Sequence, residues 1–151
     1  MANQIHICTN NPTAAGTDGT LVSEENAMTT PISAILAVTA ATGASKAVKC
    51  AVRCDAGYAV SGDTVIKVYK NTNGTYTDDY AGDALLCVDN SYADGDAALA
   101  GGSFSTSITL TGVVSTNMIF WVKRTAVAGA TPVNDKTAAL HVIANGVAAT
   151  A

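Results

Sequence analysis

Residues 46–54 of the chain read Lys46-Ala47-Val48-Lys49-Cys50-Ala51-Val52-Arg53-Cys54. Small apolar side chains occupy every second position from Val48 to Cys54, and Lys49, Ala51 and Arg53 occupy the positions between them. A period of two with charge on one side is typical of a β-strand that is buried on one face. We therefore expect a central strand here, and we expect the rest of the chain to supply partners for its apolar face.

Other short runs of this character recur along the chain and are separated by turns rich in Gly, Asn and Asp. Asn73-Gly74 predicts a hairpin, because both positions tolerate a positive φ. No helix longer than one turn is expected, and residues 89–102 and 128–136 are predicted to be loops. The predicted strands cover residues 4–8, 33–40, 58–60, 64–70, 75–77, 84–88, 104–110, 118–123 and 138–144.

This pattern predicts an all-β fold, an antiparallel β-sandwich that is Ig-like or jelly-roll-like, with a small barrel as the main rival. The first thirty residues are polar after a short strand and contain no Lys or Arg. We expect residues 1–30 to form an extended N-terminal arm or long loop. Pro31 then begins the β-sandwich domain, residues 31–151.

The composition limits the classes of partner. Hydrophobic residues make up 48% of the chain, but charged residues make up only 13%, well below the usual quarter. Such a neutral surface suits an extracellular or virion protein, or one covered by neighbouring subunits. The net charge is −4 and no dense basic patch is present, which argues against nucleic-acid binding.

Neither a membrane nor a secretory route is indicated by the sequence. No apolar run approaches the roughly 18 residues that a transmembrane helix needs. The first residues, Met-Ala-Asn-Gln-Ile-His-Ile-Cys, lack the basic start and apolar run of a signal peptide. We therefore expect synthesis in the cytoplasm, with no membrane partner.

The four cysteines are expected to be buried free thiols. Cys50 and Cys54 lie four positions apart on one strand face, which is too far for a disulfide. None of the four has the paired C-x₂-C spacing of a zinc site. A bridge between Cys8 and Cys87 is the alternative that the sequence leaves open.

No catalytic, cofactor-binding or metal-binding residues are predicted. His6 and His141 each lie in a predicted strand, and neither has the partners of a catalytic triad or a zinc site at recognisable spacing. Asn73-Gly74-Thr75 matches a glycosylation sequon, but the hairpin turn explains these residues. We therefore expect that the chain is not an enzyme and that it needs no cofactor.

Two loop features remain as candidate binding elements. Acidic loops occur at Asp78, Asp79 and Asp83, and again at Asp89, Asp94 and Asp96, yet no Glu closes either loop as in an EF-hand. Solvated turn residues are the favoured interpretation of both loops, with calcium binding as the alternative. Tyrosines beside loops can bind sugars or proteins, or cap a sandwich edge. The five are Tyr58, Tyr69, Tyr76, Tyr80 and Tyr92.

The chain resembles the small immunoglobulin-like virion proteins of tailed bacteriophages that decorate or cement capsids. The resemblance is carried by the neutral segment 1–30, by the body that runs from Pro31 through residues 46–54, and by the closing segment 137–146. It covers most of the chain, but no tight motif defines it. The cysteine pair and tryptophan spacing of antibody domains are absent. The resemblance therefore assigns no functional residue to this chain.

The resemblance implies a non-enzymatic structural subunit that stabilises the phage head. The major capsid protein or another virion protein would be its partner, the chain would be a homo-oligomer, and its location would be the virion. An arm or a strand edge would bind the capsid lattice by backbone pairing. Two alternatives stay open: a tail-tube or other tail subunit, and a glycan- or host-binding module.

Overall fold

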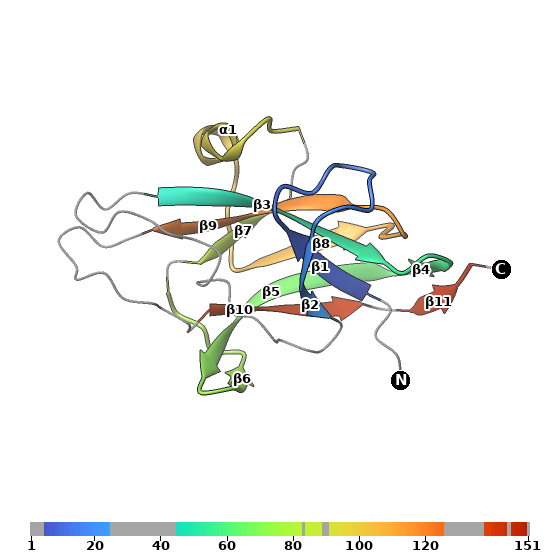
Figure 1. Ribbon diagram of the computed structural model, residues 1–151. Coiled ribbons are helices and arrows are strands. Elements are labelled where there is room, and N and C mark those ends of the chain that lie inside the picture. The colour runs from blue at the N-terminus through green and yellow to red at the C-terminus, as the bar shows by residue number, and fades with distance from the viewer. Residues whose placement is uncertain are drawn as a thin grey trace.

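The computed structural model describes residues 5–24, 45–82, 84–88, 91–125, 138–144 and 146–150. These residues form antiparallel sheets and one short helix, so the prediction of an all-β fold is confirmed (Figure 1). The elements are β1 (Ile5–Thr9), β2 (Thr20–Glu24), β3 (Ser45–Cys54), β4 (Tyr58–Val60), β5 (Asp63–Thr72), β6 (Thr75–Thr77), β7 (Leu85–Cys87), α1 (Gly95–Gly101), β8 (Ser107–Thr111), β9 (Met118–Thr125), β10 (Ala138–Ala144) and β11 (Val147–Ala149).

The larger sheet has five strands in the order β2-β1-β3-β9-β7, and all of its pairs are antiparallel. The strand β3 lies at its centre, as residues 46–54 predicted. It pairs with β9 from Ser45↔Thr125 to Val52↔Met118 on one side. On the other side it pairs with β1, where Ile5 lies opposite Cys54.

The second sheet is built around β5. Along one edge β5 pairs with all of β10, from Ala138↔Lys70 to Ala144↔Thr64. Along the other edge it pairs first with β8 and then with β6. A separate two-stranded ribbon joins β4 to β11.

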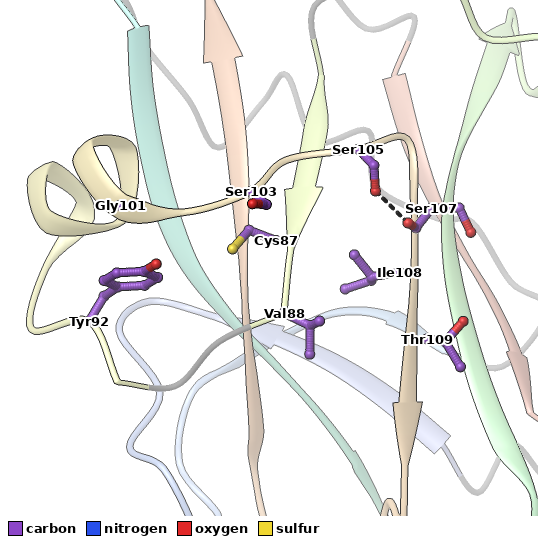
Figure 2. A pocket seen from close by; sticks show the side chains of 9 residues that line it. All are labelled: Cys87, Val88, Tyr92, Gly101, Ser103, Ser105, Ser107, Ile108 and Thr109. Atoms are coloured by element: carbon purple, nitrogen blue, oxygen red, sulfur yellow. Dashed lines mark hydrogen bonds between the residues drawn. The ribbon is translucent and has the colours of Figure 1, made fainter.

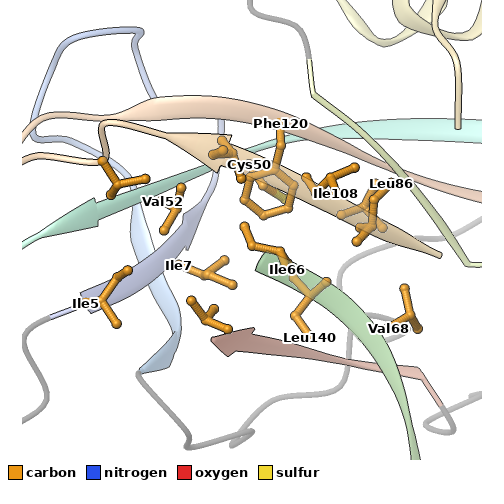
Figure 3. Packing of buried hydrophobic residues seen from close by; sticks show 14 of the residues in the cluster. Ile5, Ile7, Cys50, Val52, Ile66, Val68, Leu86, Ile108, Phe120 and Leu140 are labelled. Atoms are coloured by element: carbon orange, nitrogen blue, oxygen red, sulfur yellow. The ribbon is translucent and has the colours of Figure 1, made fainter. Parts of the chain in front are cut away.

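The main hydrophobic core lies between these two sheets (Figure 3). Ile7, Val52 and Phe120 enter it from the five-stranded sheet, and each is fully buried. Ile66 and Leu140 face them from β5 and β10. Two antiparallel sheets enclosing one apolar layer give the sandwich-like architecture that the alternating pattern predicted.

A second, smaller core corrects the expectation for the far face of β3. That face carries Lys49 and Arg53 as predicted, but Ala47 and Ala51 on it are buried. They pack with Trp121 and with Ala98 of α1. Figure 1 shows α1 on the outer side of β3 and β9, away from β5 and β10. The five-stranded sheet is therefore covered on both faces near α1.

The helix itself is a second correction, because residues 89–102 were predicted to be a loop. Asp94 caps its N-terminus, and its carboxylate accepts a hydrogen bond from the backbone N–H of Ala97 at 2.9 Å. The sequence after this cap, Asp96-Ala97-Ala98-Leu99-Ala100, contains good helix formers. Gly95 and Gly101-Gly102, which flank this run, are typical of turns and therefore favoured a loop in the sequence.

The prediction of an extended N-terminal arm is wrong for residues 5–24. Ile5 and Ile7 are fully buried in the main core, and β1 lies between β2 and β3. Two buried isoleucines in a paired strand hold this segment in the domain rather than outside it. The domain boundary at residue 31, the strand at 33–40 and the loop at 128–136 lie outside the described residues.

Most of the other predicted strands are confirmed, and their observed ends lie within three residues of the predicted ends. The hairpin at Asn73-Gly74 is also confirmed, because Asn73 has φ 50° and Gly74 has φ 89°. Positive φ at both central residues is what a type I′ turn requires, and the turn sets Thr72 opposite Thr75.

Candidate functional site

The loop between β1 and β2 has a well-defined local conformation. Asn10, Asn11 and Ala15 have positive φ values of 65°, 56° and 63°, in the left-handed region that most side chains avoid. The Asp18 carboxylate accepts hydrogen bonds from the backbone N–H and the hydroxyl of Thr13, at 2.9 and 2.8 Å. These bonds hold the pKa of Asp18 below its usual value, because they favour the ionised carboxylate.

Asn117 fastens this loop to the five-stranded sheet. Its side chain is 5% exposed, and its Nδ2 donates to the carbonyl of Thr13 at 3.0 Å and to the Asp18 carboxylate at 3.0 Å. Arg53 donates to Oδ1 of Asn117 at 2.6 Å and to the carbonyl of Asp18 at 2.8 Å. Backbone bonds add Ala15 N–H to the Asn117 carbonyl and Asn117 N–H to the Gly16 carbonyl.

We call residues 10–19 the docked loop. Its backbone is fixed by these hydrogen bonds, yet most of its side chains are exposed. A loop that is ordered before it meets a partner loses less conformational entropy on binding. The docked loop therefore offers a preformed polar contact surface.

The strand β2 continues directly from the docked loop and forms an edge of the sheet. Within the described ranges β2 pairs with β1 alone. Its Leu21 is 52% exposed, the most exposed large hydrophobic side chain among the described residues. An edge strand can accept a further strand through its backbone N–H and C=O groups.

A separate pocket of about 550 Å³ opens between α1 and β8 (Figure 2). Buried Cys87 and Ile108 contribute to its lining, and exposed Val88 lies beside them. Figure 2 shows Tyr92 at the α1 end of the pocket, whereas Ser107 and Thr109 come from β8. The other lining residues are Gly101, Ser103 and Ser105.

The two histidines lie on different sheets and have structural contacts. Nε2 of His6 lies 2.6 Å from the Asp55 carboxylate. His141 stacks on Tyr69, with ring centroids 4.3 Å apart. Burial lowers the pKa of His141, because desolvation disfavours its charged form.

The acidic loops use their carboxylates within the fold. Asp78 forms an ion pair of 2.6 Å with Lys67, which raises the pKa of Lys67. Asp79 accepts a hydrogen bond from Thr77, and Asp94 caps α1. Asp83 and Asp89 lie outside the described residues. Among the residues that are described, no group of three or more His, Cys, Asp or Glu side chains gathers as a metal site would need.

The tyrosines do not form one cluster. Tyr58 and Tyr80 pack against the main core, and Tyr92 packs against the smaller core beside α1. The Tyr80 hydroxyl accepts the backbone N–H of Ala84 at 3.0 Å. Of the five, Tyr92 lines the pocket.

All four cysteines are buried and free, as the sequence predicted. The alternative of a bridge between Cys8 and Cys87 is wrong. Burial raises the pKa of the Cys8 and Cys50 thiols, because the thiolate would lose its solvation there. These thiols behave as small apolar side chains in the core.

Sequence reasoning missed both surface features. Asn117 and Arg53 lie 64 positions apart, so no local pattern could join them. The pocket left a visible signal, since Ser103, Ser105, Ser107 and Thr109 alternate in a strand-like run.

No helix in the described ranges is long and apolar enough to cross a bilayer. No family model, curated protein or solved structure matches this chain.

Proposed function

We propose that the chain is a non-enzymatic structural subunit of a virus particle, specifically a decoration or cement subunit on the capsid of a tailed phage. The observation that carries the proposal is the continuous surface formed by the docked loop and the β2 edge. The docked loop is ordered in advance by Asn117 and Arg53, and β2 presents an edge with exposed Leu21.

The proposed contact combines two kinds of interaction. The β2 edge pairs with an extended segment of the major capsid protein, and exposed Leu21 is covered by it. The docked loop adds hydrogen bonds without a large ordering cost. Many copies on a symmetric shell then add their modest individual affinities.

The low charge of the chain supports this role. Only 13% of its residues are charged, so a broad protein contact would require little desolvation of ions. In this proposal the chain is a homo-oligomer located in the virion, and neighbouring subunits cover part of the neutral surface.

The test mixes the purified chain with capsids of the encoding phage. We expect binding at a fixed ratio to the capsid protein and a higher capsid melting temperature. Leu21→Lys places a charge on the β2 edge, and we expect it to weaken capsid binding by about tenfold or more. Val114→Lys is the matched control, because Val114 is 44% exposed and lies between β8 and β9.

Three outcomes would contradict the proposal. The first is absence of saturable binding to the capsids. The second is equal weakening by the Leu21→Lys and Val114→Lys variants, which would remove the β2 edge from the contact. The third is growth of the purified chain into stacked rings or tubes in light scattering, which would indicate a tail-tube subunit instead.

A further inference from the structure

The strand β10 presents one face to the main core and the other to the outside of the second sheet. Leu140 and Val142 are buried in the main core. Because successive side chains of a strand alternate, His141 and Ile143 lie on the opposite face. Ile143 is 40% exposed on that face, whereas His141 is half-buried. The sheet therefore holds a titratable ring partly out of water.

The side chains around His141 come from β5 and from the segment after β6. The imidazole ring lies on Tyr69, with ring centroids 4.3 Å apart and planes tilted by 34°. Directly across the strand pair is Lys67, whose Nζ lies 2.6 Å from the Asp78 carboxylate. Asp78, the carboxylate that attracts a positive charge on His141, is therefore already paired with a cation.

The Nδ1 atom of His141 is buried and has no hydrogen-bond partner within the described ranges. A neutral imidazole carries hydrogen on one nitrogen and a lone pair on the other, whereas both nitrogens of the imidazolium are donors. A proton added at Nδ1 would therefore be a buried donor without an acceptor. The same burial is the main cause of the lowered pKa of His141, and the attraction to Asp78 offsets it only in part.

We infer that His141 makes the pairing of β10 with β5 sensitive to acid, so that proton uptake by its ring loosens β10. When β10 leaves β5, the ring regains water and binds a proton at pH values where the paired form stays neutral. The contribution of His141 to pairing is therefore fully present above the usual histidine pKa. It is lost as the pH falls from there towards the lower pKa of the paired form.

The position of β10 allows a local response. In the described ranges β10 pairs with β5 alone, from Ala138↔Lys70 to Ala144↔Thr64 (Figure 1). A strand at the edge of a sheet can open without breaking the pairs of the other strands. This edge belongs to a different sheet from β2, so the inference does not rest on the proposed capsid contact.

The experiment measures the melting temperature of the full chain at pH 7 and pH 5, at equal ionic strength. Histidines change charge between these values, whereas Asp and Glu, with usual pKa values of about 4, stay mostly ionised. We expect the melting temperature to be about 2–4 °C lower at pH 5. Amide hydrogen exchange, corrected for its intrinsic pH dependence, should accelerate more in residues 138–144 than in residues 118–125 of β9.

His141→Phe removes the titrating group and keeps an aromatic ring against Tyr69, and His141→Gln is the second variant if the larger ring does not fit. We expect the fall in melting temperature between pH 7 and pH 5 to vanish in both. His6→Gln is the matched control, because His6 is the other histidine of the chain and its Nε2 lies 2.6 Å from the Asp55 carboxylate. This variant should keep the fall.

The inference is overturned if the melting temperature of the original chain does not fall, or if the fall persists in the His141 variants. Loss of the fall in His6→Gln would assign it to His6 and would also overturn the inference. Equal acceleration of exchange in β9 and β10 would show loosening of the whole fold and would contradict the release of β10. No capsid is used, so these outcomes are distinct from a failure of the proposed function.

Discussion

At the scale of single residues, Asn117 joins the docked loop to the five-stranded sheet. Its side chain and its backbone both bond to the docked loop, and Arg53 fixes its amide oxygen. A buried amide with this many partners is costly to remove, because each former partner then loses a hydrogen bond.

We predict that Asn117→Ala lowers the free energy of unfolding by about 2 kcal/mol, since several partly buried polar groups lose their partner. Chemical denaturation measures this loss. Amide hydrogen exchange should also accelerate at Ala15, whose N–H bonds to the Asn117 carbonyl.

Thr17→Ala serves as the control, because Thr17 is exposed in the same loop. We expect it to change the stability by less than about 0.5 kcal/mol. Unchanged exchange at Ala15 in the Asn117→Ala variant would show that the loop holds its conformation without this side chain.

At the scale of elements, α1 shows how a short helix depends on its neighbours. It has seven residues, too few to be stable alone in water. The Asp94 cap begins it, and packing of Ala98 on the sheet holds it over Trp121. A Cβ on Gly95 would collide with the backbone carbonyl oxygen of Ala47 in β3.

We predict that Gly95→Ala destabilises the protein by about 1–3 kcal/mol, although alanine has the higher helix propensity. The added methyl pushes α1 away from β3 and admits water to Trp121, which is 2% exposed. A red shift of the Trp121 fluorescence, together with denaturant unfolding, measures the effect.

Ala100→Gly provides the comparison, because Ala100 is exposed on the same helix. It should cost about 1 kcal/mol through helix propensity and leave the fluorescence of Trp121 unchanged. If Gly95→Ala instead stabilised the protein, the close approach of α1 to β3 would be refuted.

At the scale of the whole molecule, the four thiols report on the intactness of both cores. Cys50 and Cys54 lie in the main core and Cys87 lies in the smaller one. All four cysteines are free and at most 3% exposed. Their access to a reagent therefore requires at least local opening of the fold.

We predict that a thiol-reactive alkylating reagent labels the native protein very slowly and labels four sites per chain after denaturation without a reductant. The high pKa of the buried Cys50 thiol slows the native reaction further, since the thiolate is the reactive form. Mass spectrometry counts the labels. Recovery of only two labels under denaturing conditions would reveal a disulfide and contradict the free thiols.

Most of the strands and the tight turn at Asn73-Gly74 could be predicted from local sequence alone. Residues 46–54 predicted the central strand through their period of two, and Asn73-Gly74 predicted the hairpin through its tolerance of positive φ. Both are local properties, because alternation and turn chemistry are set by neighbouring residues. Free, buried cysteines were also predicted, because the spacing of Cys50 and Cys54 does not suit a disulfide and none of the four has the spacing of a zinc site.

The segments that cover each strand could not be predicted in this way, because they depend on contacts between distant parts of the chain. Residues 5–24 join the five-stranded sheet because β1 pairs with the edge of β3 that β9 leaves open. The helix α1 packs where Ala98 buries the apolar side chains on the outer face of β3 and β9. The docking of residues 10–19 by Asn117 and the pocket between α1 and β8 likewise join distant segments. Alternation with a period of two shows which side chains share a face of a strand. Contacts between residues that are distant in the sequence determine what that face packs against.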